Sequence, residues 1–306
     1  MGNPPPLPLP RPEAPATWSI QRLLRWTADH FATRGLDSPR LTAEVLLAHA
    51  LGVTRLRLYL DFDRPLEAAE LGAFRDLVRR RAEGVPTQQL VGGREFHGHW
   101  FAVDGRVFIP RPETELLVDA CLSALPGDGA GARVLDLCAG SGCVGLSLAL
   151  ERPAARVDAV ELSPDACAVA RQDAAALGAG DRWTLRCGDL FAPLPAEAVW
   201  QVIAANPPYV PTGTIPHLAV EVRDHEPRLA LDGGPDGLAV VRRIVREGAG
   251  RLAPGGLMAL EIGEGQAPAV QTLFAAAGLS PAAPIRDPAG HERIVTARSA
   301  AAGSIS

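Results

Sequence analysis

The chain has 306 residues, of which 47% are apolar and 21% charged, the proportions of an ordinary globular protein with room for an α/β domain and a smaller one. Its net charge of −5 argues against a large nucleic-acid footprint, and no apolar run approaches the length of a membrane span. The 5 cysteines form no CxxC pair and the N-terminus has no signal pattern, so we expect reduced cysteines and a cytoplasmic protein without a membrane partner.

The first part of the chain is expected to hold a tail, a helical domain and a linker. Residues 1–17 are Pro-rich and should form a disordered tail. Apolar residues recur at helical spacing from 18 to 84, between Pro-containing helix starts and glycine stops, which predicts a small helical domain. Residues 85–112 combine short β-like pieces with glycine turns, a pattern typical of a β-hairpin that links two domains.

From residue 113 to 298 predicted strands and helices alternate, and a flexible tail is expected at 299–306. This alternation predicts an α/β fold with a doubly wound, mostly parallel sheet covered by helices on both faces. We expect strands at 134–137, 157–160, 183–187, 199–205 and 257–262, helices at 111–125, 164–177, 238–252 and 266–277, and a closing hairpin of 279–285 with 293–297.

The sequence Asn206-Pro207-Pro208-Tyr209 directly follows one of the predicted strands. The residue before a proline is held in extended conformations, and each proline has a fixed φ and no N–H to donate. The segment should therefore be a stiff corner that presents an amide side chain, free backbone carbonyls and an aromatic ring. An amide beside free carbonyls is suited to bind a planar –NH2 group of a ligand. The alternative is that Asn206 only caps a strand that ends at a proline.

A glycine loop follows the first predicted strand, where Gly140, Gly142 and Gly145 spell GxGxxG. Glu161 ends the next strand, at a spacing where an acid binds a ribose diol. These features favour a nicotinamide enzyme and a methyltransferase about equally.

Asp136, just before the glycine loop, helps to separate the two classes. Its carboxylate would repel a pyrophosphate at the helix N-terminus but would suit the ammonium and sulfonium groups of S-adenosylmethionine. The alternative for Asp136 is a helix or loop cap. Asp189 ends the third strand, where it is either a contact for an adenine amino group or a plain turn residue.

The expected topology brings the glycine loop and the Asn206 corner together. The loop follows the first strand and Asn206 ends the fourth, and these strands should be neighbours at the point where the strand order reverses. A methyl donor and an amide acceptor would then face each other, and proximity is most of what a methyl transfer needs.

These motifs resemble the release-factor glutamine methyltransferases (the PrmC/HemK family). The resemblance is carried by the 206–209 corner, the loop of 135–142 and the segment 108–115, Phe-Ile-Pro-Arg-Pro-Glu-Thr-Glu, and it extends over 18–297. The corner alone is shared with adenine-N6 DNA methyltransferases, whereas its combination with the 108–115 segment is highly specific.

The resemblance implies a class I, Rossmann-like methyltransferase domain at 113–298 behind a substrate-recognition domain at 18–84. It implies S-adenosylmethionine as cofactor and, as substrate, the Gly-Gly-Gln loop of class-1 peptide-chain release factors. We expect no metal, because no cluster of metal ligands stands out in the sequence, and no direct nucleic-acid partner, because the charge balance is acidic. Alternatives are a ribosomal-protein glutamine methyltransferase, an adenine-N6 nucleic-acid methyltransferase and a non-enzymatic module that binds S-adenosylmethionine. The implied cofactor residues are Cys138, Ala139, Gly140, Ser141, Gly142, Glu161, Asp189, Leu190 and Asn206, and the charge argument above adds Asp136. The glutamine would be held by Asn206, Pro207, Pro208 and Tyr209.

The catalytic residues implied in this way are Asn206, Pro207 and Tyr209. We expect the Asn206 oxygen and the Pro207 carbonyl to accept the two N–H groups of the glutamine amide, and Tyr209 to pack against its plane. No general base is needed, because the nitrogen proton becomes acidic only as the N–CH3 bond forms.

The chain departs from the family pattern at three positions. Cys138 stands where glycine is usual, so its φ should be negative. Glu161 replaces a more usual aspartate, and Leu190 replaces an aromatic residue that often flanks adenine.

Overall fold

The computed structural model describes residues 18–301, which form two units divided after Val91. The expected tail at 1–17 lies outside the described residues, and so do positions 302–306 of the C-terminal tail. No helix in the described part of the chain is both long and apolar enough to cross a membrane.

The first unit is helical, as its apolar periodicity predicts. Side chains cap the helix starts: Ser19 accepts a hydrogen bond from the Arg22 N–H, and Thr54 accepts one from the Arg57 N–H. Its helices are α1 (Ile20–Ala32), α2 (Pro39–Leu51), α3 (Arg55–Leu60), α4 (Ala68–Ala82) and α5 (Thr87–Val91), and they enclose one apolar core that includes Leu24, Phe31, Leu46, Leu58 and Phe74.

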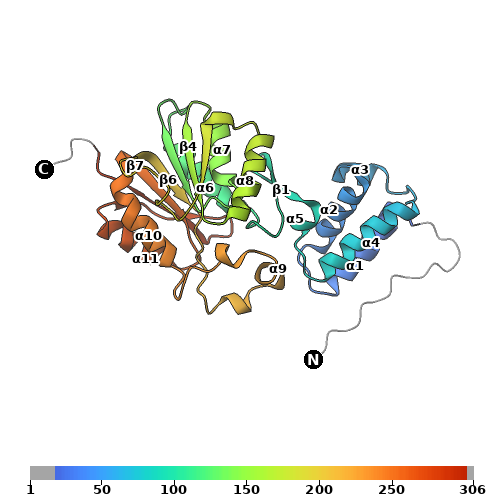
Figure 1. Cartoon of the computed structure of the whole chain (residues 1–306). Helices are drawn as coiled ribbons and strands as arrows, with labels where there is room; N and C mark the ends of the chain where they lie inside the picture. Colours follow the sequence, from blue (N-terminus) through green and yellow to red (C-terminus); the bar gives the residue numbers. More distant parts are fainter. Residues whose placement is uncertain (1–17, 302–306) are drawn as a thin grey trace. The chain divides into compact units, whose positions relative to one another are not determined.

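The second unit is built on a sheet, of which β4, β6 and β7 are labelled in Figure 1. The strand order is β5-β4-β3-β6-β7-β10-β8, with β9 paired to β10. The strands from β3 to β7 run parallel, and β10 is antiparallel to β7, β8 and β9. The predicted doubly wound, mostly parallel sheet is thus confirmed. The strands are β3 (Arg133–Leu137), β4 (Arg156–Glu161), β5 (Trp183–Cys187), β6 (Trp200–Ala205), β7 (Leu252–Glu261), β8 (Ser280–Pro281), β9 (Ile285–Arg286) and β10 (Glu292–Arg298).

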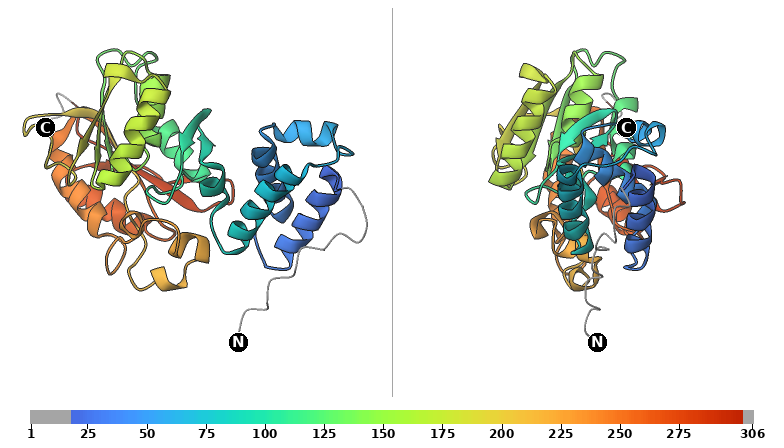
Figure 2. Two further views of the ribbon diagram at one scale, coloured as in Figure 1. Left: turned by 45° about the vertical axis from the view of Figure 1, so that its right-hand side comes forward. Right: turned by 90° about the vertical axis from the view of Figure 1, so that its right-hand side faces the viewer.

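Helices cover both faces of this sheet (Figures 1 and 2). Successive residues of β6 point to opposite faces: Val202 packs in one apolar cluster and Ile203 in the other. The first cluster holds side chains of α6 (Glu115–Ser123), α7 (Cys143–Glu151) and α8 (Pro164–Ala176), and the second those of α10 (Ala239–Gly248) and α11 (Ala267–Ala276).

Three predicted elements differ in the structure. Between 85 and 112 there is a helix, α5, before the hairpin of β1 (Gly93–Phe96) and β2 (His99–Ala102). The helix predicted at 238–252 ends at Gly248, because Leu252 already pairs with Trp200 as the first residue of β7. The helix predicted from 111 starts as a 3₁₀ turn, Pro112–Thr114, and ends at Ser123.

The expectation of reduced cysteines is wrong for one pair. Cys167 in α8 and Cys187 at the end of β5 form a disulfide, because α8 packs along β5 and holds their Cα atoms 6.4 Å apart. Cys121, Cys138 and Cys143 are free thiols.

Candidate functional site

A cavity of about 380 Å³ opens at the carboxyl ends of β3, β4 and β6. The loops that follow the parallel strands lie at this edge of the sheet, where ligands of such folds bind. β3 and β6 are neighbours, as the sequence predicts, so the glycine loop and the Asn206 corner line the same cavity. The predicted site residues that line it are Asp136, Cys138, Ala139, Gly140, Ser141, Glu161, Asp189, Leu190, Asn206, Pro208 and Tyr209. Gly142 and Pro207 are not among the lining residues.

The glycine loop turns sharply from β3 into α7. Gly140 and Gly142 have φ of 57° and 81°, and Cys138 has φ of 57°. The prediction of a negative φ at Cys138 is therefore wrong: the turn requires the left-handed region directly after β3, and Cys138 occupies it despite its Cβ.

Asp136 is buried beneath the loop and caps α7. Its Oδ2 accepts a hydrogen bond of 2.8 Å from the Gly145 N–H. A Cβ at position 145 would lie 2.7 Å from that oxygen, which explains why glycine stands there. Burial raises the pKa of Asp136 to about 7, the Glu161 charge adds to the rise, and the Gly145 N–H opposes it. The capping role is confirmed, and a contact with a cationic ligand stays a prediction.

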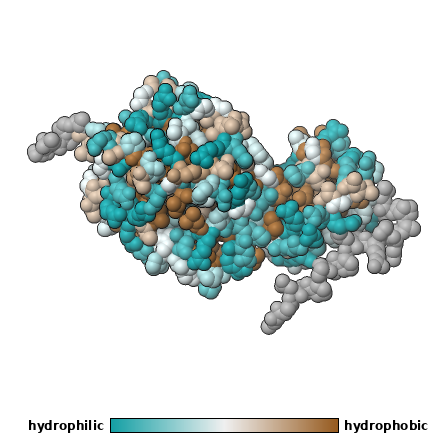
Figure 3. Space-filling view, viewed as in Figure 1, coloured by the Kyte–Doolittle hydropathy of each residue, from teal (hydrophilic) through white to brown (hydrophobic). Residues whose placement is uncertain are grey.

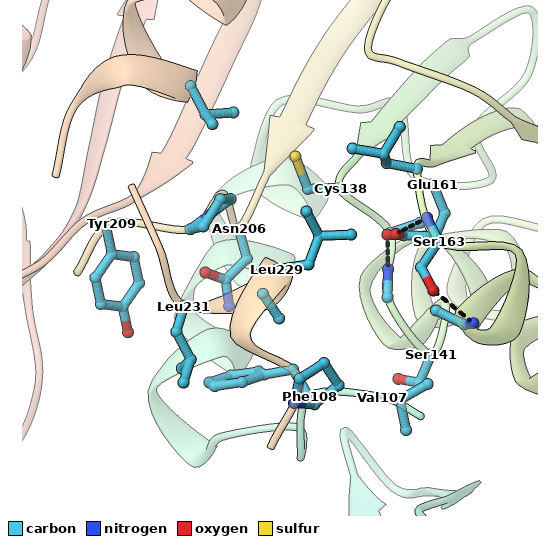
Figure 4. Close-up of a pocket in the computed structure, with 18 of the residues that line it drawn as sticks. Val107, Phe108, Cys138, Ser141, Glu161, Ser163, Asn206, Tyr209, Leu229 and Leu231 are labelled. Carbon is cyan, nitrogen blue, oxygen red and sulfur yellow. Dashed lines mark hydrogen bonds between the residues drawn. The ribbon is translucent and has the colours of Figure 1, made fainter. Parts of the chain in front are cut away.

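Glu161, the last residue of β4, is fixed at the rim of the cavity by two backbone groups. Oε2 accepts a bond of 2.8 Å from the Gly140 N–H and Oε1 one of 2.7 Å from the Ser163 N–H (Figure 4). Each oxygen still has a lone pair for a further donor. Figure 4 shows Glu161, Ser163 and Ser141 on one side of the cavity and Asn206 and Tyr209 on the other.

Asp189 and Leu190 follow β5 at the same edge. The Asp189 carboxylate pairs with the guanidinium of Arg243 from α10 at 3.0 and 2.8 Å. Sequence reasoning missed Arg243, which also lines the cavity, because it lies 54 positions further along the chain. Leu190 is buried with φ of 47°.

The Asn206 corner is held by residues from three other segments. The Asn206 Nδ2 donates to Thr114 Oγ1 at 3.2 Å, and the Tyr209 hydroxyl donates to Glu261 Oε1 at 3.3 Å. The Gln266 side chain donates to the Tyr209 backbone carbonyl at 3.0 Å. Sequence reasoning assigned no role to Thr114, Glu261 or Gln266; only Thr114 carried a signal, as part of the 108–115 segment.

A buried ion pair joins two further segments of the cavity wall. Glu226, 1% exposed at its side chain, pairs with Arg111, and its Oε2 accepts a bond of 3.2 Å from the Ile109 N–H. The Arg111 guanidinium lies 4.6 Å from the centre of the Phe108 ring. The pair thereby ties the 108–111 segment to the loop of 210–232.

The remaining wall is largely apolar. Val160, Leu190, Leu229 and Leu231 line the cavity together with Phe108. In the space-filling view, apolar side chains reach the surface as a patch in the middle of the larger unit, surrounded by hydrophilic residues (Figure 3). A cavity with a largely apolar wall and the carboxylates of Asp136 and Glu161 fits a ligand with one apolar and one charged end. Within 18–301, no group of three or more His, Cys, Asp or Glu side chains is placed to hold a metal ion.

Comparisons with known proteins agree with this architecture. Residues 22–92 match the family model of the PrmC N-terminal domain, and residues 106–242 match a model described as conserved hypothetical protein 95. A release factor glutamine methyltransferase of Geobacter sulfurreducens is 43% identical over 94% of this chain and 99% of its own length. The corresponding protein of Bordetella pertussis is 45% identical, over 87% of this chain and 96% of its own.

One solved structure supports the assignment of the fold but not of the function. The hMettl16 catalytic domain, in its complex with the MAT2A 3'UTR hairpin 1, superposes with a TM-score of 0.55 at 15% identity, over 74% of this chain and 82% of that one.

Proposed function

This chain belongs to the release factor glutamine methyltransferase family, and on that premise we propose that it transfers a methyl group from S-adenosylmethionine to the glutamine of the Gly-Gly-Gln loop of class-1 peptide-chain release factors. The observation that carries the proposal is the Asn206 amide, anchored on a Pro-Pro corner and lining the same cavity as the glycine loop. Neither a membrane nor a nucleic acid is part of the proposal.

The residues around the cavity fit S-adenosylmethionine. The carboxylates of Asp136 and Glu161 are acceptors, suited to the cationic methionine end and to the ribose diol. A Cβ on Gly140 would meet no atom within 4 Å, so the loop leaves open space, and Leu190 offers an apolar surface for adenine. When bound, the cofactor supplies an electrophilic methyl group on a sulfonium.

Asn206 would orient the acceptor. The nitrogen of a glutamine amide is a poor nucleophile because its lone pair is delocalised into the carbonyl. Since the Asn206 Nδ2 donates to Thr114, its Oδ1 is the atom left to accept an N–H of the substrate. A backbone carbonyl of the corner, at Pro207, is the proposed second acceptor. These bonds strengthen as positive charge develops on the nitrogen, so they stabilise the transition state preferentially.

Mass spectrometry of release factor incubated with enzyme and S-adenosylmethionine tests the proposal. We expect a gain of one methyl group that maps to the Gly-Gly-Gln glutamine and is lost when that glutamine is replaced. Asn206→Ala should lower kcat by roughly two to three decades, the scale for one transition-state hydrogen-bonding group. Methylation of duplex DNA or of a ribosomal protein, with release factor untouched, would overturn the assignment.

A further inference from the structure

We propose that the buried carboxylate of Glu261 fixes the orientation of the Asn206 amide through the hydroxyl of Thr114, and so makes the site selective for a primary amide over a carboxylate. Glu261 is in this view a positioning residue that need not touch the substrate. The inference rests on the proposed function, because it takes the acceptor to be a glutamine amide.

The relay begins at Asn206. Its Nδ2 donates to Thr114 Oγ1 at 3.2 Å, and Thr114 is 1% exposed. A threonine hydroxyl carries one proton, and an oxygen that accepts from Asn206 must give that proton to another acceptor. In a buried position the acceptor has to be a protein group, because an unsatisfied hydroxyl is costly there.

Glu261, the last residue of β7, is the acceptor that the proposal assigns to this proton. It is 2% exposed, and its Oε1 accepts from the Tyr209 hydroxyl at 3.3 Å. Burial raises the pKa of this carboxyl to about 7, and the neighbouring Thr114 and Tyr209 hydroxyls oppose the rise. Its buried Oε2 has no hydrogen-bond partner among the described residues and is open to a donor. Glu261 thus supports the corner through Tyr209, and in the proposed relay its open Oε2 accepts the proton of Thr114 as well.

The direction of these bonds decides which atom of Asn206 faces the acceptor. The nitrogen and oxygen of an amide have nearly the same shape, so only the donors and acceptors around them select an orientation. At pH 8, above its raised pKa of about 7, the Glu261 carboxyl is mainly ionised and only accepts. Thr114 then donates to it and accepts from Nδ2, which leaves Oδ1 for an N–H of the substrate. In the reversed orientation the Asn206 –NH2 would face the substrate –NH2, and two donors would oppose each other.

Stability alone does not explain a carboxylate at this position. Burial of a carboxylate without an ion-pair partner is destabilising. Arg293, whose charge lowers the Glu261 pKa, is already engaged with Asp287 at 2.9 Å. A neutral side chain of the same size would be less costly to bury, but it would not impose one direction on the relay.

The test is run at pH 8, where Glu261 is mainly ionised, with release factor as substrate. It uses the full-length variants Glu261→Gln, Thr114→Val, Thr114→Ser and the double variant Glu261→Gln/Thr114→Val. We expect the Gln and Val changes each to lower kcat/KM about ten- to hundredfold. The double variant should be no worse than the more severe single change, because both interrupt the same relay. Thr114→Ser, which retains the hydroxyl, should recover most of what Val loses.

A competition experiment reports the orientation directly. The inhibitor is release factor whose Gly-Gly-Gln glutamine is replaced by glutamate. The wild-type enzyme should bind it weakly relative to the substrate, whereas Glu261→Gln and Thr114→Val should narrow that preference about tenfold, because Asn206 can then turn its –NH2 toward a carboxylate.

Asp173→Asn is the matched control. Asp173 is another buried carboxylate, in α8, whose oxygens accept from the Ala102 N–H at 3.0 and 3.2 Å outside the cavity wall. Its variant should keep both kcat/KM and the amide preference, and every variant should keep its affinity for S-adenosylhomocysteine. Additive losses, or an unchanged amide preference in both relay variants, would overturn the inference while the wild type still methylates release factor. A wild type that fails on release factor would instead overturn the proposed function.

Discussion

Asp136 caps helix α7 and also lines the cavity that we propose binds S-adenosylmethionine. It caps α7 through Gly145, and its burial raises its pKa to about 7. A carboxyl group with this pKa is about half protonated at neutral pH, and a nearby cation favours its ionised form. Binding of a cationic ligand in the cavity should therefore be linked to the loss of a proton from Asp136.

We expect the affinity for S-adenosylmethionine to rise with pH, by up to about tenfold per unit between roughly pH 5 and 7, and to level off above pH 7. The sign follows from the raised pKa: below it the free protein must lose a proton to bind the cation, and above it the carboxylate is already present. Calorimetry across this range, in two buffers of different ionisation enthalpy, would detect the released proton.

Asp136→Asn provides the control, because it keeps an oxygen for the Gly145 N–H and removes the charge. This variant should bind more weakly at pH 8 and show little pH dependence. A flat wild-type profile, or a slope that survives in the variant, would show that Asp136 does not meet the cationic end of the ligand.

At the scale of elements, the buried pair of Arg111 and Glu226 joins chain segments that lie 115 positions apart. It closes the base of the 210–232 loop against the 108–111 segment, and both line the cavity. Breaking a buried ion pair from one side leaves an uncompensated charge, which typically destabilises a protein by about 3–5 kcal/mol.

We expect Glu226→Ala to lower the free energy of unfolding by about 3 kcal/mol and to expose the 210–232 loop to proteolysis. Thermal unfolding and limited proteolysis would measure the two effects. Arg228→Gln is the control, because it removes an exposed ion pair, 3.1 Å from Arg228 to Asp232, in the same loop. Its cost should stay below about 1 kcal/mol. Equal losses in the two variants would show that burial does not set the strength of the Arg111–Glu226 pair.

The same scale shows which features could be predicted from the sequence. The alternation of strands and helices and the two motifs are local sequence patterns, so they can be predicted. The alternation predicts the parallel sheet, and the strand order of that sheet places the glycine loop beside Asn206. Contacts such as those of Asn206 with Thr114, 92 positions apart, have no local periodicity and appear only once the chain is folded. The φ of Cys138 was mispredicted for a related reason, since the requirement of the turn overrides the preference of the residue.

At the scale of the whole molecule, the two units have separate apolar cores. The residues around Phe31 and Phe74 form one cluster within 18–91, and both clusters that cover the sheet lie within 92–301. Units with their own cores generally fold on their own. Residues 22–92 match the PrmC N-terminal domain, and no residue up to Val91 lines the cavity. A role of this unit in substrate recognition stays a prediction.

We therefore expect removal of residues 1–91 to abolish methylation of intact release factor while leaving the affinity for S-adenosylhomocysteine within about threefold. The physical reason is that the remaining unit keeps the complete cavity wall but loses the surface that we expect to hold a folded protein substrate. A short Gly-Gly-Gln peptide separates recognition from chemistry, because it is too small to use such a surface. The full-length and shortened enzymes should methylate this peptide at similar, low kcat/KM, measured by transfer of labelled methyl. If the shortened enzyme methylates intact release factor as well as the full chain does, the helical unit has no part in recognising the substrate.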